Sequence, residues 1–128
     1  MNREIAEKWT DALRSGEYAQ CTGALNAPGK GHCCLGVLCE LAVEAGVPVE
    51  TVEVDRRRLD AAPWHVVSYD GMTDVLPARV RDWAEMASSD GELDEYHEAY
   101  GGDLALWNDH GATFAEIADA IEAEWETL

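Results

Sequence analysis

The first pattern along the chain is a helical repeat of apolar side chains near the N-terminal end. Ile5, Trp9 and Leu13 recur every four residues, a spacing that places them on one face of a helix. This spacing predicts a helix over residues 3–15. Gly16 follows directly, and glycine readily takes the left-handed backbone conformation that ends helices. We therefore expect a helix that ends at Gly16 and buries one face.

A second helical repeat lies near the C-terminal end of the sequence. Thr113 and Glu116 have the spacing of a capping box, in which each side chain bonds to the backbone N–H of the other residue. The apolar positions that follow have a 3.6-residue period and are Phe114, Ile117, Ala118, Ile121, Trp125 and Leu128. These two signals predict a final helix that packs through this apolar face.

Between these two repeats lies a segment that is apolar nearly all round. It is expected to form a helix from residue 34 or 35 to residue 45, which Gly46 ends and Pro48 keeps from restarting. Its apolar members are Leu35, Val37, Leu38, Cys39, Leu41, Ala42 and Val43. A helix of this kind is normally buried on all sides. Gly36 lies inside it, which predicts that another backbone segment approaches closely there.

Turn residues and β-branched runs predict the strands. Residues 18–25 are expected to be extended, and the run 26–31 is a strong turn signal, so a hairpin that closes near residues 32–33 is expected. Residues 47–54 are rich in valine and predict a strand that ends in the charged run after it. A further strand is predicted over Trp64–Tyr69, ended by the turn at residues 70–71.

The pattern is weaker in the rest of the chain. Pro77 is expected to open a third helix, whose inner face would comprise Leu76, Val80, Trp83, Ala84 and Ala87. Residues 88–103 are polar, acidic and contain glycine, so we expect a loop of low order with a short turn at residues 93–96. Residues 104–107 are expected to form one helical turn. The whole pattern predicts an α+β fold in which a small antiparallel sheet packs with about four helices.

Length and composition fit one globular domain over residues 1–128. Apolar residues make up 47% of the chain, which is ordinary for a folded protein. No apolar run approaches the roughly 20 residues that a membrane helix needs, and the first residues lack the apolar core of a signal peptide. Three of the four cysteines lie in one short apolar segment, whereas a disulfide framework would spread them across loops. We therefore expect a soluble protein of the reducing cytoplasm.

Charge is distributed unevenly. The formal net charge is −17; residues 1–81 carry 12 Asp or Glu and nine Lys or Arg, whereas residues 82–128 carry 14 Asp or Glu and no Lys or Arg. This part of the chain is expected to repel nucleic acid and anionic membranes, so we expect no direct nucleic-acid partner and no membrane partner. Solubility alone explains such a surface, and a surface that imitates nucleic acid is the sharper alternative.

The candidate metal ligands are His32, Cys33, Cys34 and Cys39. Zinc needs about four nitrogen or sulfur ligands that converge at roughly 2.0–2.3 Å, and adjacent cysteines on an extended segment point to opposite sides. Buried thiols that pack as small hydrophobic groups fit this segment better, so we expect no metal and no cofactor. A zinc site and a reactive thiol are the alternatives.

Motifs for catalysis are weak. The four histidines have no motif around them, and no serine stands in a nucleophile elbow. The glycines near residue 30 lack the Gly-Lys-Ser/Thr ending of a phosphate-binding loop. We therefore expect a protein without catalytic residues, and an enzyme whose site no motif reveals is kept as an alternative.

Scarce cations and tryptophans give the candidate ligand site. Arginine forks bind phosphates with two bonds, and tryptophan faces stack on bases. The residues predicted to bind a ligand are Arg56, Arg57, Arg58, Trp64, Arg79 and Arg81. The alternative is that these arginines balance surrounding acids and that Trp9, Trp83 and Trp125 belong to the core.

A resemblance joins several of these segments. The residues that carry it are Trp9, Ala12-Leu13-Arg14-Ser15-Gly16-Glu17-Tyr18, Gln20, Gly23, Leu25, Cys33-Cys34-Leu35-Gly36-Val37-Leu38-Cys39, Leu41-Ala42, Leu76-Pro77, Trp83, Asn108-Asp109, Gly111, Thr113-Phe114, Glu116-Ile117-Ala118 and Ile121. Together they resemble a family of small uncharacterised proteins of tailed bacteriophages and prophages. The resemblance covers most of the chain except residues 46–75 and 88–103. It implies an accessory protein that acts inside a bacterial host cell, and it carries no catalytic residues.

Two binding hypotheses follow. The first is that the protein sequesters a small phosphorylated ligand derived from a nucleotide, as a counter-defence function. Such a ligand would need a pocket completed by a homo-oligomer or an interface, because one small domain has little room for a deep cleft. The second is that the acidic C-terminal third blocks a host protein that binds nucleic acid.

Overall fold

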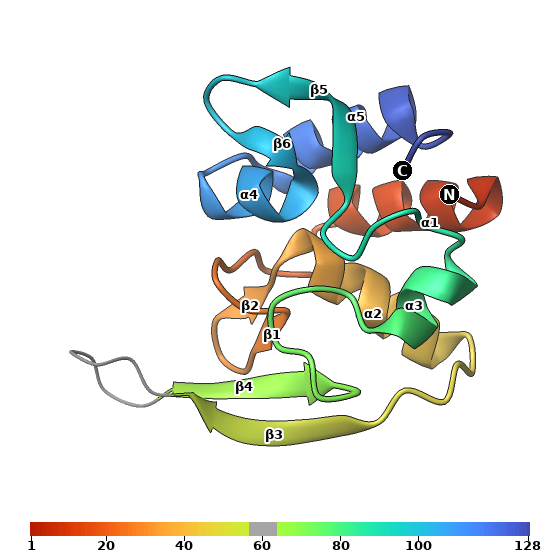
Figure 1. The fold of residues 1–128 in the computed structure, drawn as a ribbon. Coiled ribbons are helices and arrows are strands. Elements are labelled where there is room, and N and C mark those ends of the chain that lie inside the picture. Colours follow the sequence, from red (N-terminus) through yellow and green to blue (C-terminus); the bar gives the residue numbers. More distant parts are fainter. Residues whose placement is uncertain (57–63) are drawn as a thin grey trace.

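The computed structural model describes residues 1–56 and 64–128, and within them the chain forms five helices and six strands (Figure 1). In chain order they are α1 (Arg3–Arg14), β1 (Asn26–Ala27), β2 (Gly31–His32), α2 (Cys34–Glu44), β3 (Thr51–Arg56), β4 (Trp64–Tyr69), α3 (Ala78–Trp83), β5 (Glu92–His97), β6 (Gly101–Asp103), α4 (Leu104–Asp109) and α5 (Phe114–Glu124). The predicted α+β class is confirmed. In these residues the strands form three separate antiparallel pairs, β1–β2, β3–β4 and β5–β6, where one small sheet was expected.

Local capping signals set the ends of the two outer helices. The Asn2 side chain accepts a bond from the Ile5 N–H at 3.1 Å and caps α1, which Gly16 follows with a φ of 76°. The capping box of α5 is present, since Thr113 and Glu116 each accept a backbone N–H of the other. Both predicted helices are confirmed. Their end signals lie within or next to the helices themselves, so a local pattern is enough to locate them.

Helices α1 and α5 lie side by side although they come from opposite ends of the chain (Figure 1). Trp9 of α1 and Ile117 and Ile121 of α5 are fully buried. The Met1 ammonium group donates a hydrogen bond to the Leu128 carbonyl oxygen at 2.8 Å, so the two ends of the chain meet. This helix pair covers one side of the hydrophobic core.

Helix α2 is the centre of the core. Its buried members are Cys34, Leu35, Gly36, Val37, Leu38, Cys39 and Ala42. The Cys33 sulfur accepts a bond from the Gly36 N–H at 3.4 Å and caps the helix. A Cβ atom at Gly36 would lie 1.7 Å from the Leu25 carbonyl oxygen, so the predicted close approach of another backbone is confirmed. Within the described ranges, no helix has both the length and the apolar character to cross a membrane.

The first two hairpins match the predictions in part. The turn before Gly31 joins β1 to β2 as expected, but residues 18–25 are irregular apart from one bridge between Gln20 and His32. Strand β4 has the predicted bounds, whereas β3 begins at Thr51 and not at residue 47. Residues 47 and 49 instead pack their valines against the core, and Pro48 between them has no N–H to give a sheet.

Helix α3 is shorter than its apolar pattern suggested. It ends at Trp83, and Glu85 takes a φ of 55°, which is incompatible with a continuing helix. As a result Met86 is buried in place of Ala87, which is exposed, and Trp83 is only partly buried. The predicted inner face is therefore correct for Leu76, Val80 and Ala84 and wrong for its last member.

The predicted loop over residues 88–103 is wrong. This segment forms the β5–β6 hairpin, which Figure 1 shows at the end of the molecule opposite β3 and β4. Tertiary contacts hold it: Leu93 is 7% exposed, and a Glu124 carboxylate oxygen of α5 accepts the N–H groups of Asp94 and Glu95 at 3.1 and 3.4 Å. The sequence of the segment is polar because only one of its β5 side chains enters the core.

Candidate functional site

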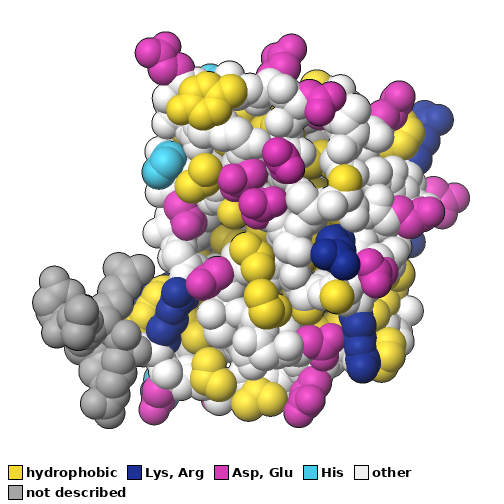
Figure 2. Space-filling model, viewed as in Figure 1, with side chains coloured by type: hydrophobic (Ala, Val, Ile, Leu, Met, Phe, Trp, Pro, Cys, Tyr) yellow, Lys and Arg dark blue, Asp and Glu magenta, His cyan; other side chains and the backbone are white. Residues whose placement is uncertain are grey.

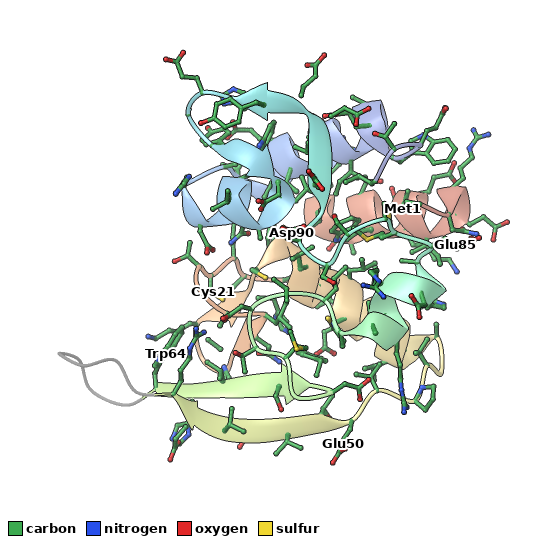
Figure 3. The ribbon with its side chains drawn as sticks, viewed as in Figure 1. Met1, Cys21, Glu50, Trp64, Glu85 and Asp90 are labelled. Carbon is green, nitrogen blue, oxygen red and sulfur yellow. The ribbon has the colours of Figure 1, made fainter. Side chains whose placement is uncertain are left out.

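Arg56 and Trp64, two of the predicted ligand-binding residues, meet at one end of the β3–β4 hairpin. They are opposite each other in the strand register, and the Arg56 guanidinium carbon lies 5.9 Å from the centroid of the indole ring. The Lys30 ammonium nitrogen lies 4.8 Å from the same centroid. Figure 3 shows Trp64 at this end of the hairpin and Glu50 at the other. The two cations and the indole form the basic corner of the molecule.

The Arg56 fork is already occupied by protein groups. Its Nη1 lies 2.6 Å from both an Asp74 carboxylate oxygen and the Gly23 carbonyl oxygen, and its Nη2 lies 3.0 Å from the second Asp74 oxygen. A pocket of about 230 Å³ lies beside it and is lined by Gly23, Ala24, Cys33, Arg56, Asp74, Ala105 and Asp109. This lining holds two carboxylates and one guanidinium group, so a phosphate there would have to displace Asp74 and approach Asp109.

The other predicted arginines do not join this corner. Arg79 donates to the Pro48 carbonyl oxygen and lies 3.5 Å from Asp70, which directly follows β4. Trp64 begins the same strand, so about 20 Å of strand separates the two contacts. Arg81 lies 3.4 Å from Asp82. Arg57 and Arg58 lie outside the described residues.

Most of the acids of residues 82–128 are exposed, and they lie on α3, β5, β6, α4, α5 and the segments that join them. In the described part of the chain their ion pairs are Asp82–Arg81, Asp119–Arg14 and Glu122–Arg14. Figure 2 shows acidic side chains spread over the upper part of the molecule, where the β5–β6 hairpin lies in Figure 1. Most of this negative charge therefore faces solvent without a neighbouring cation.

An aromatic cluster lies within this acidic surface. The rings of His97 and Tyr100 are stacked with centroids 4.7 Å apart, and Trp107 contacts both at 5.1 and 5.3 Å. The Tyr100 hydroxyl donates to a Glu116 carboxylate oxygen at 3.1 Å, which ties the hairpin to α5. Tyr96 beside the cluster is 76% exposed. The sequence reasoning missed this cluster, because it took the segment for a loop.

A second group that the sequence reasoning missed surrounds Glu40 of α2. The Tyr69 hydroxyl donates to the Glu40 carboxylate and accepts a bond from the Asn26 amide at 3.1 Å. The His32 Nε2 atom lies 3.7 Å from a Glu40 oxygen. The nearby His32 and the Tyr69 hydroxyl hold the pKa of Glu40 below its ordinary value, so the carboxylate is ionised at neutral pH. Glu40 and Glu44 are the two acids of an otherwise apolar helix, and a charged residue in that helix was the available signal.

The cysteine segment is buried as predicted. All four thiols are free, and burial raises the pKa of the Cys33 thiol to about 12 and the pKa values of Cys34 and Cys39 well above their ordinary value. These thiols are protonated at neutral pH and make poor nucleophiles. Across the described ranges, no three His, Cys, Asp or Glu side chains come together as a metal site.

Asn108 of α4 is fully buried, and its side chain connects α4 to α2 and to the segment before β1. Its side-chain oxygen, Oδ1, accepts hydrogen bonds from the Cys34 backbone N–H at 3.1 Å and from the Gln20 side-chain amide at 2.9 Å. Its amide nitrogen donates to the Cys21 carbonyl oxygen at 2.8 Å. The neighbouring Asp109 accepts the Gly23 N–H at 3.0 Å. Four of the segments that carry the family resemblance therefore meet at Asn108 and Asp109.

The fold and these surfaces define a small α+β protein with a thiol-rich buried helix and an acidic aromatic surface. The chain matches, over residues 1–125, the family described as a domain of unknown function, DUF8296. The chain belongs to that family. No curated protein and no solved structure matches it.

Proposed function

We propose that this chain is a non-enzymatic accessory protein that binds a basic surface of a nucleic-acid-binding protein through the acidic surface of residues 82–128. One observation carries the proposal: this surface lacks Lys and Arg in its own sequence, and the described structure brings few cations to it from elsewhere. The resemblance to phage proteins supports a role inside a bacterial host cell, where such partners are abundant.

The charge of the acidic surface acts on a partner at long range, and the aromatic side chains of the hairpin provide contact area once the partner is bound. A field of one sign steers a basic partner and speeds its association. Exposed tyrosine is enriched at protein interfaces, because its ring gives a large contact area and its hydroxyl forms a bond. Tyr96 is exposed among Asp94, Glu95 and Glu98, so both contributions come from one hairpin.

Sequestration of a phosphorylated ligand is the second candidate. The observation that favours it is the indole of Trp64 with two cations beside it, next to a pocket of about 230 Å³. The bonds from Arg56 to Asp74 and the carboxylate of Asp109 argue against it. Calorimetric titration with a panel of cyclic and linear nucleotides tests it, and binding that Arg56→Ala removes would favour it over the acidic-surface proposal.

The acidic-surface proposal is tested with a variant that removes three exposed charges from the hairpin, Asp94→Asn/Glu95→Gln/Glu98→Gln. Binding to each of a panel of purified basic bacterial DNA-binding proteins is measured by calorimetry at two salt concentrations. We expect the chain to bind at least one of these proteins, and we expect duplex DNA to compete with it for that protein. The triple variant should bind it about tenfold more weakly, since each exposed charge contributes on the order of 0.5 kcal/mol.

The matched control is Glu4→Gln/Asp11→Asn/Glu17→Gln, which removes the same charge from exposed acids outside this surface. It should change the affinity by no more than about twofold. Equal weakening in both variants would show that only net charge matters. An unchanged affinity in the hairpin variant would exclude this surface as the binding site.

A further inference from the structure

A separate cleft lies between α2 and the β3–β4 hairpin, away from the acidic surface. Its volume is about 330 Å³, and its lining residues are Asn26, Glu40, Val43, Thr51, Val52, Glu53 and Val67. Val43 and Val52 are 39% and 44% exposed, which is high for large apolar side chains in this protein. The cleft thus presents apolar walls to solvent next to the Glu40 group.

Two carboxylates lie among these apolar walls. Glu40 is ionised at neutral pH, and in the described residues His32 is its one ion-pair partner. Glu53 forms no ion pair with any described residue, and it is one of the residues that line the same cleft. Aliphatic walls with carboxylates match a side chain that has an apolar stem and a cationic end, as lysine and arginine do.

One edge of the hairpin beside the cleft has no strand partner. Strand β3 pairs with β4 alone in the described residues, and Figure 1 shows it as the outermost strand. The Glu50 carbonyl oxygen accepts the Asp70 N–H, and the Val52 carbonyl oxygen accepts the Ser68 hydroxyl, so these residues face β4. Backbone groups alternate along an antiparallel pair, so the N–H and C=O groups of Thr51 and Glu53 point away from β4.

From the cleft and the free edge together we propose that a partner protein adds an extended basic segment to β3 and places a lysine or arginine side chain in the cleft. Addition of a strand to a free edge uses the backbone for affinity and side-chain pockets for selection. Here the selecting groups are Glu40 and Glu53, with Val43 and Val67, which pairs with Glu53 across the hairpin, against the stem of the side chain. The site is independent of the acidic surface of residues 82–128.

Charge decides the nature of the segment. The strand and its surroundings carry five acids, Glu40, Glu44, Glu50, Glu53 and Asp55, which favour a basic strand and oppose an acidic one. The cation of the strand itself, Arg56, is held by Asp74. A second copy of this chain would bring its own Glu53 and Asp55 to the same edge, at a net charge of −17 per copy. The basic segment of another protein is therefore the occupant that the charges favour.

The experiment uses a fluorescently labelled peptide that alternates valine and lysine, and the same peptide with glutamine in place of lysine. Fluorescence anisotropy of the full chain with each peptide gives the affinities. We expect the lysine peptide to bind at least about tenfold more tightly, because the carboxylates recognise its cations. Glu40→Gln/Glu53→Gln should lose this preference, and Glu53→Gln alone should reduce it.

A proline tests the free edge. Thr51→Pro removes an N–H that points away from β4, which an edge strand tolerates at its first residue. It should weaken binding about fivefold or more, whereas Thr51→Val, which keeps the N–H, should change it by less than about twofold. Far-ultraviolet circular dichroism and the thermal midpoint establish that each variant is folded.

Four results would overturn this site. The first is equal binding of the lysine and glutamine peptides, and the second is unchanged affinity of Glu53→Gln. The third is equal loss in Thr51→Pro and Thr51→Val, which would assign the effect to the side chain. The fourth is loss of peptide binding in Asp94→Asn/Glu95→Gln/Glu98→Gln, which would move the site to the acidic surface. Normal peptide binding by that variant keeps the two proposals separate.

Discussion

Helix α2 and the β5–β6 hairpin differ in where they place their chemistry. In α2, seven residues are buried, and burial raises the pKa values of its two thiols. In the hairpin, Leu93 alone among the β5 residues is buried, and carboxylates and Tyr96 face solvent. Buried side chains are thus concentrated in α2, whereas exposed carboxylates and an exposed tyrosine are concentrated in the hairpin.

The two regions also differ in how their sequences compare with what their side chains contact in the folded chain. The cysteine-rich string looks like a reactive or metal-binding motif in the sequence, but its side chains contact Leu104, Gly36 and the core. The hairpin looks like a featureless acidic loop in the sequence, but it holds an ordered aromatic cluster at the surface. A distinctive motif therefore marks a packing requirement here, and the plainer segment exposes carboxylates and aromatic rings.

The largest expected effect compares one glycine from each region. Gly36→Ala places a Cβ atom 1.7 Å from the Leu25 carbonyl oxygen, so it should lower the free energy of unfolding by about 3–5 kcal/mol. Gly102→Ala in β6 meets the Tyr96 ring at 3.6 Å, an ordinary contact, and should change it by less than about 0.5 kcal/mol. Urea unfolding of both variants measures the difference, and a tolerated Gly36→Ala would contradict the close approach of α2.

A smaller effect is expected at the network that connects α2 to α4. Asn108→Ala leaves the Cys34 N–H and the Cys21 carbonyl group without partners in a buried place, so it should cost about 2–4 kcal/mol. The control is the exposed neighbour, Asp109→Ala, which loses the bond from the Gly23 N–H and a longer one from the Asn108 amide and should cost about 0.5–1 kcal/mol. Equal costs in urea unfolding would show that burial of the network is not what stabilises it.

The smallest of the three effects is a pH dependence. The folded-state pKa of Cys33 is raised to about 12, so the folded chain holds this proton more tightly than the unfolded chain. Its contribution is complete below the unfolded pKa of about 9 and is lost as pH rises towards 12. Between pH 8 and pH 10 the free energy of unfolding should fall in both proteins. In Cys33→Ala it should fall by about 1 kcal/mol less than in the original chain.

Urea unfolding at pH 8, 9 and 10 measures this slope, and both proteins are compared at each pH because the substitution also changes the stability at pH 8. Parallel curves for the two proteins would mean that the Cys33 thiol is accessible to water in the folded chain. All other titrating groups are common to the two proteins, so the difference between their slopes reports on the Cys33 thiol.

The predictions that succeeded rest on short-range signals. Gly16, Thr113 and Glu116 act within one turn of their own helices, so the end of α1 and the start of α5 could be predicted closely. The site predictions depended on distance between segments and fared differently. Arg56 and Trp64 meet because the register of β3 and β4 pairs them, while Arg79 contacts the other end of the same hairpin. No local pattern specifies that register.

The sequence by itself determined the α+β class, the buried character of α2, the capped outer helices and the uneven charge, because each follows from composition or from residues close together in the chain. Tertiary structure alone decided that residues 92–103 form a hairpin, because Leu93 and Glu124 hold it from outside its own sequence. It also placed Glu40 against Tyr69 and His32, and among the described residues it left one edge of β3 without a strand partner. Those contacts join residues far apart in the chain, and their energy exists only when the core that aligns them has formed.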